Sequence, residues 1–300
     1  MKVIKPVTIT DAMLISSTAP ETDHPAWSAA TTYALAARVI LTSTHRIYES
    51  LQAANLNKPP ASNPTWWLDV APTNRWACFD QRVNTATGLA SPLTITLAAG
   101  YANALALLGL VGDQALVTVT DGPGGALVYS RTVQLDGTLL VDWYQYFFEP
   151  RLQLAELALV DLPPYVDARI TASITGVAAV ACSTLVVGAA YTLGDTRYGA
   201  KLNIIDYSRK DTDAFGVTTF VRRAFSKRMA ATLLLPTGQI NKIQQVLADL
   251  RATPCVWVGM DAEPTGAYSA LIVFGFYRDF SISVDYPSYS ACSLDIEGLT

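Results

Sequence analysis

Short runs of alternating and β-branched residues recur about every ten residues through the middle of this chain, and no other feature restricts its fold as much. The runs occupy residues 93–97, 115–120, 127–133, 152–157, 168–175 and 184–188. Turn sequences, at residues 121–125 and at Asp136-Gly137, separate some of them. Strands of this length and spacing predict a β-sandwich of the jelly-roll kind over residues 88–195.

The rest of the chain divides into three further segments. Residues 1–20 contain one β-branched run and predict a strand followed by a connector, and residues 21–87 read as a small β module rich in aromatics. In residues 196–300, Thr237 precedes a stretch with apolar residues at helical spacing, flanked by strand-like runs at 231–235 and 254–258. We therefore expect a mainly β chain whose C-terminal domain is α+β or a β-barrel with one helix.

Charged residues are scarce, and this indicates assembly. Hydrophobic residues make up 51% of the chain and charged residues 15%, against about 25% charged in an ordinary soluble domain. This balance excludes a disordered chain, and a net charge of −4 gives no reason to expect nucleic acid as a partner. A surface with so few charges predicts burial in subunit contacts, and hence a homo-oligomer.

A membrane protein would also have few charges. Two long uncharged stretches, residues 83–112 and 170–194, are broken by Gly, Ser and Thr, the first also by Pro92. Neither supplies the roughly 20 apolar residues that a spanning helix needs. The start of the chain lacks the apolar region of a signal peptide. We expect a soluble, unsecreted chain with no membrane span.

Residues that carry chemistry are few and scattered. The four cysteines (Cys78, Cys182, Cys255 and Cys292) form no CxxC motif and are expected to be buried and reduced. With two histidines, His24 and His45, a zinc site or a catalytic triad has little to build on. The pairs Glu149 with Glu156 and Asp261 with Glu263 are interpreted as surface acids. We predict no catalytic residues, no metal site and no cofactor, and hence no enzyme.

A basic stretch spans residues 197–228. It holds eight Lys and Arg residues against three aspartates (basic: Arg197, Lys201, Arg209, Lys210, Arg222, Arg223, Lys227 and Arg228). Phosphate or DNA binding is one interpretation, but the stretch contains neither a recognition helix nor a Gly-rich phosphate loop. A charged contact between subunits, or a solvated face, is the favoured interpretation.

An ordered series of aromatics lies near the N-terminus: Trp27, Tyr33, the strand-like Ile47-Tyr48-Glu49, and Trp66-Trp67 after a Pro-rich gap. This series resembles the small chitin-binding modules that are appended to bacterial chitinases and often to phage tail proteins. The resemblance covers residues 27–70. Ala36 stands where those modules usually have Gly, and their Asp before Val39 is missing.

The resemblance implies a glycan contact through exposed aromatic faces, for which Tyr33, Tyr48, Trp66 and Trp67 are the candidates. The alternative is that so small a unit needs its aromatics for a core. The departures from the family pattern favour that alternative. We then expect Trp27 and Trp66 in the core, and one of the adjacent Trp66 and Trp67 buried while the other faces outward.

The C-terminal segment resembles tail-tip and baseplate proteins of tailed bacteriophages. The resemblance rests on Asp206-Tyr-Ser-Arg-Lys210, Phe215-Gly216, Thr219-Phe-Val-Arg222, Trp257-Val-Gly259, Gly275-Phe276 and the ending Ser293-Leu-Asp-Ile-Glu-Gly-Leu299. The middle segment looks like the galactose-binding-like jelly rolls of such proteins. These resemblances imply a position beside the tail tube.

The sequence thus predicts a structural virion protein of a phage tail tip or baseplate, assembled in the host cytoplasm. We expect three or six copies around the tail axis, contacts with other tail proteins and a weak contact with a host-surface glycan. The alternative is a carbohydrate-binding protein of the tail that recognises the host receptor. An enzyme such as a cell-wall glycosidase is the third hypothesis.

Overall fold

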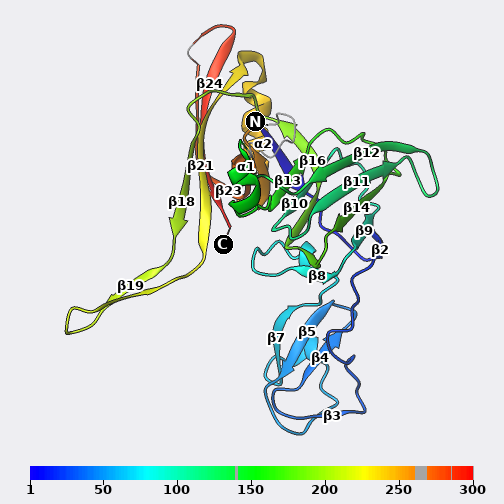
Figure 1. The fold of residues 1–300 in the computed structure, drawn as a ribbon. Helices are drawn as coiled ribbons and strands as arrows, with labels where there is room; N and C mark the ends of the chain where they lie inside the picture. The colour runs from blue at the N-terminus through cyan, green and yellow to red at the C-terminus, as the bar shows by residue number, and fades with distance from the viewer. Residues whose placement is uncertain (139–140, 261–268, 285, 300) are drawn as a thin grey trace.

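A computed structural model describes residues 1–138, 141–260, 269–284 and 286–299 (Figure 1). Strands account for 48% of the chain and helical turns for 10%, which confirms the expected mainly β fold. The strands form two larger sheets and several small ones. Within the described residues, no helix is both long enough and apolar enough to cross a bilayer.

The larger sheet has ten strands, and each neighbouring pair is antiparallel. In spatial order they are β13 (Glu156–Leu159), β10 (Ala104–Leu108), β16 (Thr184–Thr192), β1 (Lys2–Pro6), β22 (Cys255–Val258), β23 (Ile272–Ser283), β24 (Tyr289–Gly298), β21 (Phe225–Pro236) and β17 (Asp195–Thr196), with β18 (Lys201–Asp206) also on β21. The sheet curls into an open half-barrel.

The N-terminal strand β1 lies in the centre of this sheet. Val3 pairs with Tyr191 of β16 on one side and with Trp257 of β22 on the other. Gly188 of β16 permits this close approach, because a Cβ there would lie 1.9 Å from the carbonyl oxygen of Lys5. One sheet therefore runs through the position 195/196, where we placed a boundary between the middle and C-terminal segments.

A second, five-stranded sheet covers one end of the half-barrel. Its order is β12 (Leu127–Gln134), β11 (Gln114–Thr120), β14 (Arg169–Thr175), β9 (Leu93–Leu97) and β2 (Leu14–Ser17). Alternate residues such as Ile95, Val117 and Ile170 share one buried cluster with Leu105 and Val187 of the larger sheet. The two layers form the sandwich that the alternating sequence predicted.

The helix α2 (Ile240–Asp249) packs against the C-terminal strands of the larger sheet, with Ile243 and Leu247 buried. It is the helix that the apolar spacing predicted. The sequence also predicted that Thr237 caps this helix, and that prediction is wrong. Thr237 begins the 3₁₀ turn η3 (Thr237–Gln239), and Gln239 precedes the helix without a side-chain cap. The Thr237 hydroxyl instead hydrogen-bonds Ser290 at 3.2 Å.

Residues 27–72 form a separate small module, drawn in blue to cyan at the bottom of Figure 1. It contains a pair, β3 (Thr32–Tyr33) and β6 (Asn55–Leu56), a three-stranded sheet of β4 (Arg38–Leu41), β5 (Arg46–Ser50) and β7 (Trp67–Pro72), and the turn η1 (Pro60–Ser62). His45 links the module to the N-terminal connector, with Nδ1 2.8 Å from Glu21 and Nε2 2.8 Å from Asp11.

Smaller elements complete the fold. They are the turns η2 (Ala77–Phe79) and η4 (Ser269–Leu271), the pair β8 (Thr87–Ala90) with β15 (Ala179–Cys182), the helix α1 (Trp143–Phe148), and the pair β19 (Arg209–Thr212) with β20 (Thr218–Val221). The β19–β20 pair belongs to a long hairpin that projects from the body (Figure 1).

Candidate functional surfaces

The aromatic side chains proposed for glycan contact form most of the core of the small module. Tyr33, Tyr48 and Trp67 are buried together with Val39. The Tyr33 and Trp67 rings meet edge to face, with centroids 5.3 Å apart. Trp67 Nε1 donates to the carbonyl oxygen of Lys58 at 2.7 Å. These three rings are therefore not available for stacking on a sugar.

The pairing of β7 with β5 decides which of the adjacent tryptophans is inside. Trp67 pairs with Ser50 and is 2% exposed, whereas Trp66 is half-buried at the margin of the core. We expected Trp27 and Trp66 in the core. Both are instead half-buried and pack against the edge of the buried cluster. The amino group of Lys58 lies 5.6 Å from the centre of the Trp66 ring.

Ala36, which replaces the usual glycine of the chitin-binding pattern, keeps the backbone conformation of a glycine. Its φ is 63°, in the left-handed region that glycine favours. The backbone is held there because Ala36 N–H donates to the carbonyl oxygen of Ser50 at 2.8 Å. The turn that glycine usually makes is thus retained with a strained residue, which indicates that the module keeps its scaffold.

The cysteines are buried, as predicted, and none is disulfide-bonded. Burial raises the pKa of Cys78 and of Cys255 to about 12 and that of Cys292 to about 11. Burial also raises the pKa of Cys182. Thiols in this state are poor nucleophiles and poor metal ligands.

The acidic residues in the described part of the chain form no group suited to holding a metal ion with His or Cys. Glu149 lies at the exposed end of α1, and Glu156 lies on β13 in an ion pair with Lys227. Asp261 and Glu263 lie outside the described residues. In the described pair, therefore, one carboxylate is neutralised and the other is in solvent.

Several cations of the basic stretch are paired within the chain. Lys227 pairs with Glu156, Arg228 with Asp295, and Arg209 with Asp211. Burial raises the pKa of Glu156, although Lys227 opposes that effect. The hydrogen bond from Arg228 lowers the pKa of Asp295. The two inner cations therefore stabilise the sheet and offer little free charge to a phosphate.

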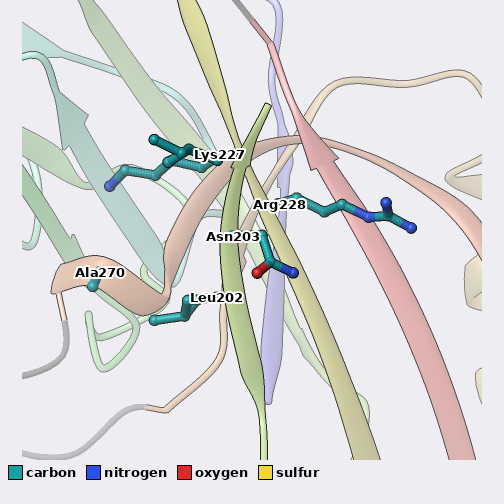
Figure 2. A pocket seen from close by; sticks show the side chains of 6 residues that line it. Leu202, Asn203, Lys227, Arg228 and Ala270 are labelled. Carbon is teal, nitrogen blue, oxygen red and sulfur yellow. The ribbon is translucent and has the colours of Figure 1, made fainter. Parts of the chain in front are cut away.

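Those two cations flank an open depression of about 480 Å³ at the root of the projecting hairpin. Its lining comprises Leu202, Asn203, Ile204, Lys227, Arg228 and Ala270. Figure 2 shows Lys227 and Arg228, neighbours on β21, pointing to opposite sides of the strand. Because both are in ion pairs, the depression lacks the unpaired charge of an anion site.

The projecting hairpin, which we call the arm, consists of residues 201–225. All of these residues are described and none is buried; Ile205, Ser208 and Asp211 are half-buried and the rest are exposed. The exposed residues include Ile204, Phe215, Val217, Phe220 and Phe225. An isolated two-stranded hairpin of this kind is marginally stable in water.

The tip of the arm is an ordered turn. The carboxylate of Asp213 accepts hydrogen bonds from the N–H groups of Phe215 and Val217, at 2.9 and 2.8 Å. Gly216 supplies a φ of 84°, which few other residues tolerate. The turn holds Phe215 outward, where it is 93% exposed.

A second exposed apolar segment, which we call the aromatic excursion, comprises residues 141–152. Its centre is α1, none of whose residues is buried. Asp142 caps the helix, since its carboxylate accepts from Gln145 N–H at 2.8 Å, and the Gln145 side chain accepts from Val141 N–H, just before the cap, at 2.7 Å. The helix exposes Trp143, Tyr144, Tyr146, Phe147 and Phe148 by 60% to 78%.

The base of the excursion is closed by hydrogen bonds from Leu152 N–H to the Thr138 hydroxyl and from Gly137 N–H to Leu152, both 2.8 Å. The expected strand over residues 152–157 is thus only partly correct, since β13 begins at Glu156. Sequence reasoning missed the excursion altogether. The signal was available: five of the six residues from Trp143 to Phe148 are aromatic.

Comparison with known proteins adds no family: no model of a protein family matches the chain, and no curated protein matches it.

Proposed function

We propose that this chain is a structural virion protein of a tailed bacteriophage, in the tail tip or baseplate. Its copies oligomerise around the tail axis, three or six to a ring, and link neighbouring tail components. It is assembled in the host cytoplasm, carries no cofactor and catalyses no reaction.

One observation carries this proposal: a well-packed body exposes two apolar segments, the arm and the aromatic excursion. Phe215 and Phe220 on the arm are 93% and 77% exposed, and Trp143 of the excursion is 78% exposed. Contiguous apolar surface on a soluble protein marks contact with a partner. Exposed apolar segments such as these are expected in a component whose partners cover them on assembly.

The resemblance to phage tail proteins supplies the setting. Its residues lie on the arm, at 206–210, 215–216 and 219–222, and mainly on the strands β22, β23 and β24 of the larger sheet. The resemblance therefore falls on the protrusion and on the sheet from which it projects. This placement supports a role in which the arm makes contacts within the tail.

Carbohydrate recognition is the second candidate. Trp66 favours it, because this ring alone among the four candidates is half-buried instead of buried, although Lys58 lies over the ring, 5.6 Å from its centre. The burial of Tyr33, Tyr48 and Trp67 disfavours it, because sugar binding by stacking needs several exposed rings. A glycan array on the purified chain, repeated with Trp66→Ala, distinguishes the two. Binding abolished by Trp66→Ala would favour recognition of a host glycan.

The proposal is tested on the phage that encodes the chain. Mass spectrometry of purified particles should detect the protein, and electron cryomicroscopy should place three or six copies at the tail end. Deletion of the gene should leave tails incomplete or absent. Complete, infectious particles that lack the protein would overturn the proposal.

A further inference from the structure

The arm and the aromatic excursion of this chain have complementary chemistry. The arm carries five basic and three acidic residues, a net charge of +2, whereas the whole chain carries −4. The remainder of the chain is therefore at −6. Residues 136–152, which contain the excursion, have three acidic residues and one basic residue. Opposite charge draws the arm of one copy towards the body of another.

The exposed aromatic residues of the arm and of the aromatic excursion are also complementary. On the arm, Phe220 pairs across the hairpin with Lys210, so an aromatic ring and a cation lie side by side. Arg222 and Arg223 follow after Val221 and are exposed. The excursion offers a cluster of rings in which Tyr146 and Phe147 meet edge to face at 5.1 Å. Exposed aromatic rings attract both other rings and the cations of Arg and Lys.

We propose that the arm of one copy docks on the aromatic excursion of a second copy, through the Phe215 and Phe220 rings and the arginines beside them. The contact joins two different patches of the same chain, so it is heterologous and propagates head to tail. Such a contact generates a ring when the rotation between copies closes. The inference deepens the proposed function and rests on it for the ring, but it names the two surfaces that hold the ring together.

A second copy is the occupant that the observations favour, because both halves of the contact belong to this chain and carry opposite charge. A lipid surface would take the excursion but would leave the arm uncovered. A different tail protein would need one complementary surface for the arm and another for the aromatic excursion. These two alternatives become outcomes of the test.

The test uses two double variants of the full chain. The arm variant is Phe215→Ser with Phe220→Ser, and the excursion variant is Trp143→Ser with Phe147→Ser. All four side chains are at least 69% exposed, so neither variant removes core packing. The matched control is Tyr101→Ser, an aromatic 58% exposed elsewhere on the surface. Circular dichroism and thermal melts verify that each variant is folded.

Light scattering after size exclusion gives the masses. The wild type and the Tyr101→Ser control should form a closed oligomer, and each double variant alone should be a monomer of 32.3 kDa. A mixture of the two variants should form a dimer of about twice that mass. The intact arm of the excursion variant still docks on the intact excursion of the arm variant, but the chain cannot propagate further.

Each contrary outcome overturns the inference. A monomeric wild type excludes self-docking, and an excursion variant that keeps the wild-type mass shows that the oligomer does not depend on the excursion. A mixture that remains monomeric excludes the head-to-tail contact. Excursion-dependent binding to phosphatidylcholine–phosphatidylglycerol vesicles, with no change in oligomer mass, would assign the patch to a lipid surface. Particle composition tests the proposed function separately, so a tail protein with a different interface is distinguishable from a protein outside the tail.

Discussion

Replacement of Trp67 by alanine in the small module separates a core role from a binding role. Trp67 is 2% exposed, touches Tyr33 edge to face and donates to the Lys58 carbonyl oxygen. Removal of a buried tryptophan costs about 3–5 kcal/mol through lost burial and the remaining cavity. The lost hydrogen bond leaves the Lys58 carbonyl without this partner, at a further cost of about 1 kcal/mol.

The module has few means to absorb that loss. Its buried cluster consists of Tyr33, Val39, Tyr48 and Trp67, with four half-buried neighbours around them. Whole domains are stable by only about 5–15 kcal/mol, and a unit this small lies at the lower end. Trp67→Ala is therefore expected to unfold the module while the larger sheet remains folded.

Hydrogen exchange measured by mass spectrometry on the full chain reports the two parts separately. Amides of β4, β5 and β7 should lose protection in Trp67→Ala, and those of β16 and β24 should keep theirs. Trp66→Ala is the matched control, since this neighbouring ring is half-buried and its loss should cost roughly 1–2 kcal/mol. Unchanged protection in Trp67→Ala, or greater loss in Trp66→Ala, would refute the core assignment.

Three further changes probe other parts of the chain. Ala36→Gly should raise the melting temperature of the module in calorimetry, because φ at Ala36 is 63° and the left-handed conformation costs an L-residue about 1–2 kcal/mol; an unchanged transition contradicts this. Gly188→Ala should strongly destabilise the larger sheet to urea, because the new Cβ would lie 1.9 Å from a carbonyl oxygen of β1, whereas Gly122→Ala, with open space around it, should not. The hydrogen bond from Arg228 lowers the pKa of Asp295, so the stability it contributes is present above the usual carboxyl pKa and is lost as the pH falls through the lowered one; acid unfolding of Asp295→Asn should lack that component.

The sequence predicts the elements whose burial is one-sided. Strands β9, β11 and β14 alternate because one face meets the sandwich core, and α2 shows helical spacing because Ile243 and Leu247 face the sheet. In these segments the local pattern and the tertiary environment agree, so the pattern alone identifies the element. The same alternation placed Trp66 and Trp67 on opposite sides.

The local sequence pattern does not determine the register between strands that are distant in the sequence. It could not tell which of Trp66 and Trp67 is inside, because that depends on the pairing of Trp67 with Ser50. Nor could it place β1 between β16 and β22, since Val3 pairs with residues about 190 and 250 positions away. The continuous sheet across 195/196 follows from those long-range pairings, and a division by composition alone misses it.

The continuity of that sheet bears on the role proposed for the arm. The strand β21 begins at Phe225, at the root of the arm, and continues into the core as far as Pro236. Nine of its residues pair with β24, from Arg228 to Pro236, and Arg228 adds its ion pair with Asp295 across the same two strands. A pull along the arm therefore loads these hydrogen bonds together, as shear, and does not stretch a flexible linker. The tip is also ordered before any contact forms, because Asp213 already binds the N–H groups of Phe215 and Val217. A contact at this turn would pass load along the arm into the larger sheet, as the proposed link between neighbouring subunits requires.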